Sequence, residues 1–247
     1  GCGLRCVFCQ NYEIARAAAG EEIPEERLAE IFLELQDQGA ANINLVTPTP
    51  YVPQIAEALT SAKRQGLALP VVYNCGGYEK VSTLQRLEGL VNIWLPDYKY
   101  ESRELARRYS RAEDYPDRVK EALDEMVRQA GRPVFAPDGR MLRGVIARHL
   151  VLPGQKEDSK AVVAYLYRRY QDRIYLSLMR QYTPLPQAAA FPELNRKVTS
   201  YEYEQVVDHA LALGVTRGFM QRGGTAKESF IPAFDGQGIR RERKGEK

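Results

Sequence analysis

The sequence is poor in the features that mark membrane, secreted and nucleic-acid-binding proteins. Its 247 residues contain no apolar run near the length of about 20 residues that crosses a bilayer. Cysteines and Arg5 interrupt the first apolar residues, so no signal peptide is visible. The formal net charge of +3 is too small to indicate a nucleic-acid partner. We therefore expect a cytoplasmic protein that binds neither membrane nor nucleic acid.

Cysteine is also scarce, and its distribution is uneven. Only four cysteines are present: Cys2, Cys6 and Cys9 in the opening stretch GCGLRCVFCQN, and Cys75 far downstream. This crowding is unlike a secreted disulfide framework and favours a metal site in a reducing compartment. Thiolates suit zinc and iron–sulfur clusters. Three thiolates on one short loop can hold three corners of a cubane cluster and leave its fourth iron open to a reactant.

Two other interpretations start from the same cysteines. Cys2, Cys6, Cys9 and Cys75 together have the composition of a structural zinc site, which would make the chain a zinc-stabilised α/β binding module. Thiols without any metal are disfavoured, because three exposed thiols on one loop oxidise readily. Metal analysis separates these cases, since iron with acid-labile sulfide indicates the cluster and one zinc per chain indicates the module.

Strand-like and helix-like segments alternate along the chain, without internal repeats. Short apolar strands are expected at residues 42–46, 70–75, 91–99, 145–154, 173–179 and 214–221. Helical segments are expected at 24–38, 52–65, 80–89, 101–110, 116–130, 158–170 and 201–213. This order predicts βαβ units and a parallel sheet, curled like a barrel or open and doubly wound. A hairpin is predicted around 137–139, and a long, functional coil at 183–200.

The downstream sequence adds a family resemblance to the cysteine spacing. The pattern C-x3-C-x2-C, with Phe8 just before the last cysteine, resembles the radical S-adenosylmethionine superfamily. The stretches CVFCQN, NLVTPTPYVPQI, VVYNCGGYE, WLPDYKY, RHLVLPG and FIPAFD resemble its branch similar to pyruvate formate-lyase activating enzyme. The resemblance implies an α/β fold, a partial (β/α)6 TIM-like barrel of the radical SAM type over residues 1–234, followed by a basic tail at 235–247. The barrel's first strand is expected before Gly1, and the chain has no initiator methionine.

The resemblance also implies cofactors and an activity. Cys2, Cys6 and Cys9 would ligate a [4Fe–4S] cluster whose open iron chelates S-adenosylmethionine. With an electron from flavodoxin or ferredoxin, the cluster cleaves this compound to a 5′-deoxyadenosyl radical that abstracts hydrogen, while the protein orients the reactants and excludes water. The implied substrate is a glycyl-radical enzyme under anaerobic conditions. A small metabolite is the enzymatic alternative, because a fold does not fix a substrate.

Residues at the predicted carboxyl ends of the strands are candidate contacts to S-adenosylmethionine. Asp97 and Lys99 lie two apart, so they share a strand face, and they match a D-x-K pattern of activating enzymes. Asn74 is the polar residue at the end of another strand. Where many members carry Gly-Gly-Glu to bind the amino group, this chain has Thr47 and Thr49, whose oxygens accept hydrogen bonds.

Three further cofactor contacts are predicted at Phe8, Val151 and Gln181 by position in the family motifs. The candidates also have structural interpretations: an Asp97–Lys99 ion pair and a rigid TPTP turn. Tyr98, Tyr100 and Tyr182 near strand ends are expected either to line a substrate cleft or to pack as core or rim residues. A buried core role is the simpler interpretation of Cys75, against a radical relay or fourth ligand, and of His149, against a proton donor.

Overall fold

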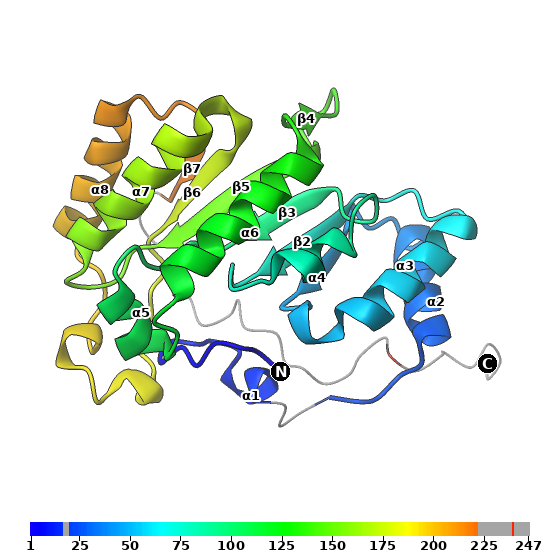
Figure 1. Cartoon of the computed structure of the whole chain (residues 1–247), viewed down its shortest axis with the longest axis horizontal. Helices are drawn as coiled ribbons and strands as arrows, with labels where there is room; N and C mark the ends of the chain where they lie inside the picture. The colour runs from blue at the N-terminus through cyan, green and yellow to red at the C-terminus, as the bar shows by residue number, and fades with distance from the viewer. Residues whose placement is uncertain (17–19, 222–238, 240–247) are drawn as a thin grey trace.

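The computed structural model describes residues 1–16, 20–221 and 239, and Figure 1 shows their path. Seven strands form one sheet in the order β1-β2-β3-β5-β6-β7, with β4 paired to β5. The strands are β1 (Ile43–Val46), β2 (Val71–Cys75), β3 (Ile93–Pro96), β4 (Val134–Phe135), β5 (Met141–Leu150), β6 (Tyr175–Met179) and β7 (Gly218–Met220). All neighbouring pairs are parallel except β4–β5. The predicted α/β fold with a partial, unclosed barrel is therefore confirmed.

Helices cover one face of this sheet, and Figure 1 shows α4, α6 and α7 in front of it. Eight α-helices lie within the described residues: α1 (Tyr12–Ala15), α2 (Glu25–Asp37), α3 (Val52–Arg64), α4 (Val81–Gln85), α5 (Arg103–Ser110), α6 (Tyr115–Ala130), α7 (Lys156–Tyr170) and α8 (Ser200–Leu213). One apolar cluster joins Phe32 and Ile55 of α2 and α3 to Ile43 and Val71. A larger cluster lies under the other helices. Burial of these apolar faces holds the layers together.

The predicted elements are present, but several of their ends were wrong. Pro24 has extended backbone (φ −72°, ψ 159°) and precedes α2 instead of belonging to it. The predicted helix at 80–89 is only α4, because tight turns follow it and Gly89 is left-handed (φ +74°). The hairpin at 137–139 exists and extends β5 back to Met141. The coil at 183–200 contains two short 3₁₀ helices, Pro186–Ala188 and Pro192–Leu194.

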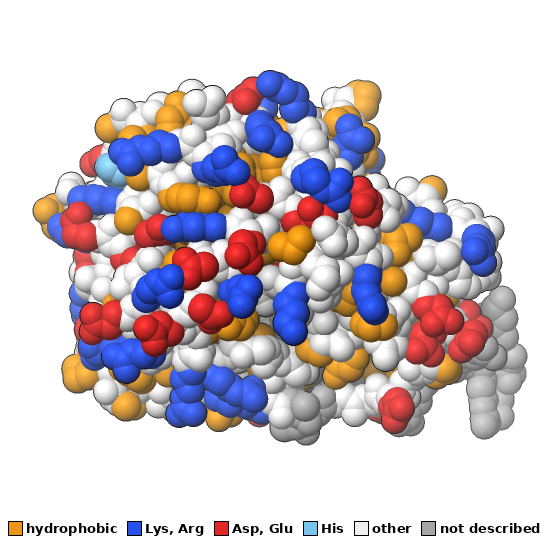
Figure 2. Space-filling model, viewed as in Figure 1, with side chains coloured by type: hydrophobic (Ala, Val, Ile, Leu, Met, Phe, Trp, Pro, Cys, Tyr) orange, Lys and Arg blue, Asp and Glu red, His pale blue; other side chains and the backbone are white. Residues whose placement is uncertain are grey.

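The charged surface is mixed in sign. Figure 2 shows basic and acidic side chains interspersed over the helix-covered face. Several of them pair, as Arg169 does with Asp124 at 2.9 Å. No helix in the described part of the chain is both long and apolar enough to cross a membrane. The predicted basic tail at 235–247 and the FIPAFD stretch lie outside the described residues, apart from Ile239.

Strand register gathers polar side chains on the face of the sheet opposite the helices. Val46 pairs with Asn74, and Asn74 pairs with Leu95. Asp97, two residues after Leu95, forms an isolated parallel bridge with Arg148 of β5. Because alternate residues share a face, these residues line one side of the sheet at the carboxyl ends of its strands. This is the edge where parallel α/β proteins place their active sites.

Candidate functional site

The amino-terminal segment 1–11 lies at the carboxyl-end edge of the sheet and is bound to α5 (Figure 1). The Arg5 N–H donates to the carbonyl of Ser110 at 3.0 Å, and the Val7 N–H donates to the carbonyl of Tyr109 at 2.9 Å. Both carbonyls belong to the last turn of α5, where helix carbonyls lack partners within the helix. The helix end therefore fixes the path of the segment that carries three of the four cysteines.

Cys2, Cys6 and Cys9 all lie on this segment, are half-buried, and are close enough for their charges to act on the pKa of Cys6 and of Cys9. Burial raises the pKa of Cys6 and Cys9, and a charge on Cys2 would raise both further, whereas the Lys99 ammonium acts in the opposite direction. The raised pKa favours the protonated thiols of Cys6 and Cys9 in the free protein, while a metal would bind them as thiolates. Three soft donors beside one ammonium fit an anionic iron–sulfur cluster.

The fourth cysteine, Cys75, lies in a different environment. It ends β2 on the helix-covered face, where it is buried in the core beside the carboxyl group of Glu79. Burial, and then the charge of Glu79, raise the pKa of Cys75 well above its ordinary value. Within residues 1–16, 20–221 and 239, no group of three or more His, Cys, Asp or Glu side chains is arranged for a single metal ion. The core interpretation of Cys75 agrees with these contacts.

Glu79 is a buried carboxyl group that the sequence analysis missed. Only 3% of the residue is exposed, and burial raises its pKa to about 7. Thr49 donates its hydroxyl to Glu79 Oε1 at 2.7 Å, and the Tyr73 hydroxyl donates to Oε2 at 3.2 Å. Glu79 therefore ties the turn after β1 to the end of β2. Its position in the family-like stretch VVYNCGGYE could have drawn attention to Glu79. A single glutamate in a loop, however, gives no sign in the sequence that it is buried.

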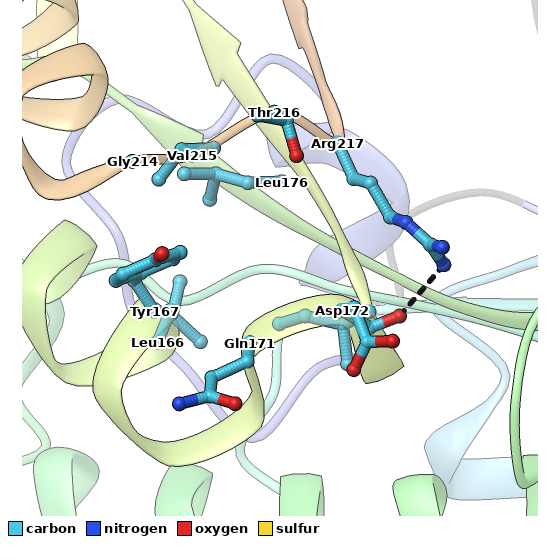
Figure 3. Close-up of a pocket in the computed structure, with 10 residues that line it drawn as sticks. Leu166, Tyr167, Gln171, Asp172, Leu176, Gly214, Val215, Thr216 and Arg217 are labelled. Atoms are coloured by element: carbon cyan, nitrogen blue, oxygen red, sulfur yellow. Dashed lines mark hydrogen bonds between the residues drawn. The ribbon is translucent and has the colours of Figure 1, made fainter.

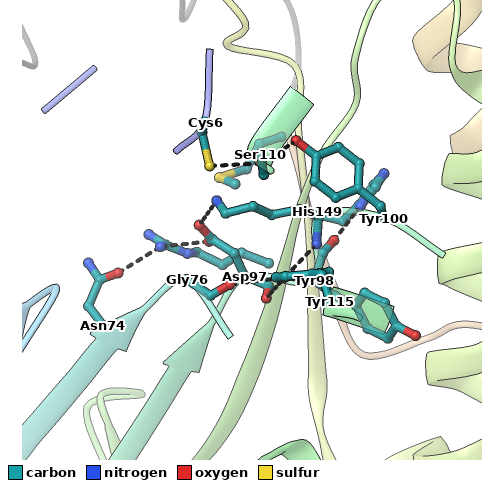
Figure 4. Close-up of polar contacts among 12 residues, drawn as sticks. Cys6, Asn74, Gly76, Asp97, Tyr98, Tyr100, Ser110, Tyr115 and His149 are labelled. Carbon is teal, nitrogen blue, oxygen red and sulfur yellow. Dashed lines mark hydrogen bonds and ion pairs between the residues drawn. The ribbon is translucent and has the colours of Figure 1, made fainter. Parts of the chain in front are cut away.

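An ion cluster fills the polar face at the ends of β2, β3 and β5 (Figure 4). Asp97 Oδ2 lies 2.7 Å from Lys99 Nζ, and Asp97 Oδ1 lies 2.7 Å from an Arg148 guanidinium nitrogen. The same nitrogen of Arg148 donates to Asn74 Oδ1 at 2.6 Å. Burial opposes ionisation of Asp97, but Arg148 and Lys99 outweigh it and lower its pKa. The predicted residues Asn74, Asp97 and Lys99 thus meet, and Arg148 adds a second cation.

Backbone contacts hold Asp97 in this position. The Tyr115 hydroxyl of α6 lies 2.7 Å from the Asp97 carbonyl, and it accepts the Lys99 N–H at 2.9 Å. Gly77 has φ +77°, and a Cβ atom there would lie 2.2 Å from the Asp97 carbonyl oxygen. Only glycine permits this backbone approach. Neither Tyr115 nor Gly77 was predicted as part of the site, because both act through chain segments distant in sequence.

Aromatic side chains form the wall beneath the cysteine segment. Phe8 makes edge contacts with Tyr100 and Tyr182 at centroid distances of 6.4 and 6.2 Å. Lys99 Nζ lies 5.9 Å from the Phe8 ring centroid, within the range of a cation–π contact. Tyr98, Tyr100 and Tyr182 are all buried. The core interpretation of these tyrosines is therefore correct, and they line no open cleft.

The remaining predicted residues also end strands at this edge. Thr47 follows β1 in the left-handed region (φ +53°), which is strained for a β-branched residue. Val151 is fully buried after β5. Gln181, after β6, accepts a hydrogen bond from Gln221 at 3.0 Å. His149 is buried with Nδ1 2.7 Å from the Tyr98 carbonyl, in agreement with a core role.

A cavity of 280 Å³ lies elsewhere on the sheet (Figure 3). It is bordered by Leu176 at the amino end of β6, by Asp172, and by Thr216 and Arg217 before β7. Arg217 donates to the Asp172 carbonyl across it at 2.9 Å. Because the ion cluster lies at the carboxyl ends of the strands, this cavity is at the opposite edge and is not part of the candidate site.

Comparison with protein families places the cysteine segment and most of the sheet in one family model. The model of the Radical SAM superfamily matches residues 1–166. An uncharacterized protein of Methanocaldococcus jannaschii, MJ0674, is 28% identical over 219 residues. That alignment covers 85% of this chain and 60% of the relative, so the chain spans less than two thirds of that protein.

Solved structures show the same fold at low sequence identity. Streptococcus suis SuiB has a TM-score of 0.61 and 14% identity, over 90% of this chain and 47% of that chain. The FeFe-hydrogenase maturase HydG from Carboxydothermus hydrogenoformans has a TM-score of 0.59 and 12% identity, over 90% of this chain and 52% of that chain. SuiB has also been solved with S-adenosylmethionine and with its precursor peptide SuiA. This chain spans about half the length of SuiB and HydG.

Proposed function

The chain belongs to the radical SAM superfamily, and we propose that it cleaves S-adenosylmethionine reductively at a cluster held by Cys2, Cys6 and Cys9. The cofactors of this family are a [4Fe–4S] cluster and S-adenosylmethionine, and the bound cluster supplies the electron that breaks the sulfonium bond. The proposal is supported most by the placement of Cys2, Cys6 and Cys9 together on one half-buried segment, apart from Cys75, which is buried in the core at the end of β2.

The ion cluster beside the thiols provides the groups that would bind the sulfonium cofactor. Asp97 and Asn74 present oxygens suited to ribose hydroxyls, and Lys99 and Arg148 present cations suited to the methionine carboxylate. Two cations against one carboxylate leave this edge positively charged, which favours an anionic group. Tyr115 fixes the Asp97 and Lys99 backbone, so these groups are oriented before the cofactor arrives.

The strand ends around the ion cluster complete the proposed cofactor site. Thr47 and Thr49 would accept hydrogen bonds from the amino group, in place of Gly-Gly-Glu. The Thr49 hydroxyl proton is directed at Glu79, which leaves its oxygen lone pairs to accept. Val151 and Gln181 at the ends of β5 and β6 would border the adenine. Phe8, between Lys99 and two buried tyrosines, would shield the cluster side from water.

We further propose that the substrate is a polypeptide, with a glycyl-radical enzyme as the specific partner. The resemblance of six sequence stretches to activating enzymes supports this choice, and SuiB, which shares the fold, has been solved with a precursor peptide. Flavodoxin or ferredoxin would supply the electron. Transfer of deuterium from a labelled glycyl-radical partner into 5′-deoxyadenosine tests this proposal, and transfer from a small metabolite alone would contradict it.

Anaerobic reconstitution followed by product analysis tests the proposed cleavage. The reduced wild-type protein should convert S-adenosylmethionine to 5′-deoxyadenosine and methionine in equal amounts. Cys6→Ala should form neither product, because it removes one of three cluster ligands. Cleavage retained by Cys6→Ala would contradict the ligand assignment, and one zinc per wild-type chain with no iron would contradict the whole proposal.

A further inference from the structure

Two buried hydroxyl groups connect the protein core to the sulfur of Cys6. Ser110 Oγ lies 3.0 Å from Cys6 Sγ, and the Tyr100 hydroxyl lies 2.8 Å from Ser110 Oγ (Figure 4). Ser110 is 1% exposed and Tyr100 is 0% exposed. In the described part of the chain, the hydrogen bond of Ser110 goes to the sulfur of Cys6 and not to that of Cys2 or Cys9. A side-chain hydroxyl in the core therefore contacts one particular cysteine of the three.

The direction of these hydrogen bonds follows from the number of protons. A metal-bound thiolate only accepts, and a serine hydroxyl carries one proton, so Ser110 donates to Cys6. The oxygen of Ser110 must then accept from the Tyr100 hydroxyl. Successive donors in a buried chain polarise one another and strengthen the terminal bond. The terminal bond in this chain is the one to the sulfur.

Neighbouring contacts prevent the hydroxyl pair from turning away. Ser110 is the last residue of α5, and its carbonyl accepts the Arg5 N–H at 3.0 Å. The next residue, Arg111, is left-handed (φ +54°) and ends the helix there. The Tyr100 ring is packed at 6.4 Å from Phe8 and 5.7 Å from Tyr115, measured between ring centroids. The same backbone contact that places Cys6 therefore also places the hydroxyl that faces it.

We propose that Ser110, oriented by Tyr100, raises the reduction potential of the cluster that Cys6 helps to hold. This inference rests on the proposed function. Hydrogen bonds to cluster sulfurs are one of the determinants of cluster potential. One-electron reduction by flavodoxin or ferredoxin adds negative charge to the cluster, so a donor at the sulfur stabilises the reduced state more than the oxidised state. Ser110 and Tyr100 are thus positioning residues that act through Cys6.

A potentiometric titration followed by electron paramagnetic resonance tests the inference on anaerobically reconstituted full chains. Ser110→Ala should lower the ratio of reduced to oxidised cluster at a fixed potential by about three- to tenfold, which is about 28–59 mV for one electron. Tyr100→Phe should shift the potential in the same direction by less, because Ser110 still donates to the sulfur. Ser110→Thr, which keeps the hydroxyl, should restore most of the wild-type potential.

Two matched controls separate the hydrogen bond from general effects of substitution. Ser102→Ala removes a hydroxyl at the other end of α5, where Ser102 accepts from the Leu105 N–H at 3.3 Å. Tyr182→Phe removes a buried hydroxyl whose ring also contacts Phe8, but that hydroxyl donates to the Leu194 carbonyl at 2.8 Å. Both control variants should keep the wild-type potential.

The outcomes distinguish this inference from the proposed function. A wild-type chain without iron and sulfide would overturn both. A full cluster in Ser110→Ala with the wild-type potential would overturn the inference and leave the proposed function intact. If Ser110→Ala fails to assemble a cluster, Tyr100→Phe decides, since it keeps the serine and the ring: a lowered potential supports the inference, and an unchanged one overturns it.

Discussion

At the scale of single residues, the four cysteines differ in what surrounds them. Cys6 on the amino-terminal segment faces Ser110 and Lys99, whereas Cys75 is buried in the core beside Glu79 on the helix-covered face. We therefore expect Cys75→Ala to keep the wild-type iron and sulfide content, with a stability loss of about 1 kcal/mol for the lost packing of a buried side chain. Iron and sulfide should be measured in Cys75→Ala and in Cys6→Ala, and the second variant should lose the cluster. Equal loss of metal from both variants would favour the four-cysteine zinc site.

Glu79 should make stability depend on pH in a defined direction. Its pKa is raised by burial from 4.5 to about 7, so the folded state holds a proton that the unfolded state releases first. The contribution of the Glu79 carboxyl group to the free energy of unfolding therefore falls by about 3 kcal/mol as the pH rises from about 4.5 to 7. Glu79→Gln cannot ionise, so its stability relative to the wild type should increase by about that amount between pH 5 and pH 8.

Urea unfolding of the cluster-free proteins at several pH values measures this difference. The exposed Glu204→Gln on α8 is the control, and its unfolding free energy should run parallel to that of the wild type. If the unfolding free energy of Glu79→Gln also changed with pH in parallel with that of the wild type, Glu79 would be ionised in the folded protein at pH 5.

Residue-level prediction from the sequence succeeded where strand alternation decided the outcome. The spacing of Asp97 and Lys99 predicted that they share a face, and they form an ion pair at 2.7 Å. Asn74, predicted as the polar residue at the end of its strand, accepts a hydrogen bond from Arg148 in the same ion cluster. Arg148 was not among the predicted contacts, because its contact with Asp97 depends on strand register between distant segments. Sequence alone does not contain that register.

At the scale of elements, the turn between β2 and α4 determines where Asp97 lies. Gly77→Ala would place a Cβ atom 2.2 Å from the Asp97 carbonyl oxygen and 2.9 Å from a Val119 methyl group. We expect a loss of about 3 kcal/mol or more in unfolding free energy, from this clash together with the left-handed backbone. Gly89→Ala is the control, because Gly89 is also left-handed (φ +74°) but has open space around it. That change should cost about 1 kcal/mol.

Urea unfolding compares the two glycine variants directly. Equal costs would mean that backbone strain alone matters and that the Asp97 carbonyl can move aside. A displaced Asp97 should also weaken the binding of S-adenosylmethionine to the Gly77→Ala protein, whereas Gly89→Ala should bind it normally.

The order of elements was predictable, whereas their junctions were not. Apolar runs separated by amphipathic segments gave the strand and helix order, because burial imposes those periods directly. Thr47 shows the limit: nothing in a TPTP turn reveals that a threonine adopts φ +53°. The attachment of the cysteine segment to α5 was likewise missed, since it depends on backbone donors at Arg5 and Val7 meeting carbonyls about 100 residues away.

At the scale of the whole molecule, the proposed site and the cavity of Figure 3 lie at opposite edges of one sheet. S-adenosylmethionine should therefore slow hydrogen exchange at the strand ends near Asn74, Asp97 and Val151, because a bound ligand stabilises the state it contacts. Exchange near Leu176 and Arg217, beside the cavity, should stay unchanged. Exchange followed by mass spectrometry measures both regions in one sample, and protection confined to the cavity edge would relocate the binding site.

We propose that the thiolates of Cys2, Cys6 and Cys9 leave one iron of the cluster free for S-adenosylmethionine. Electron–nuclear double resonance on the reduced cluster, with ¹⁵N- and ¹⁷O-labelled methionine in S-adenosylmethionine, tests it most directly. We expect hyperfine coupling from both the amino nitrogen and the carboxylate oxygen. A fully assembled cluster that shows neither coupling in the presence of saturating S-adenosylmethionine would contradict it.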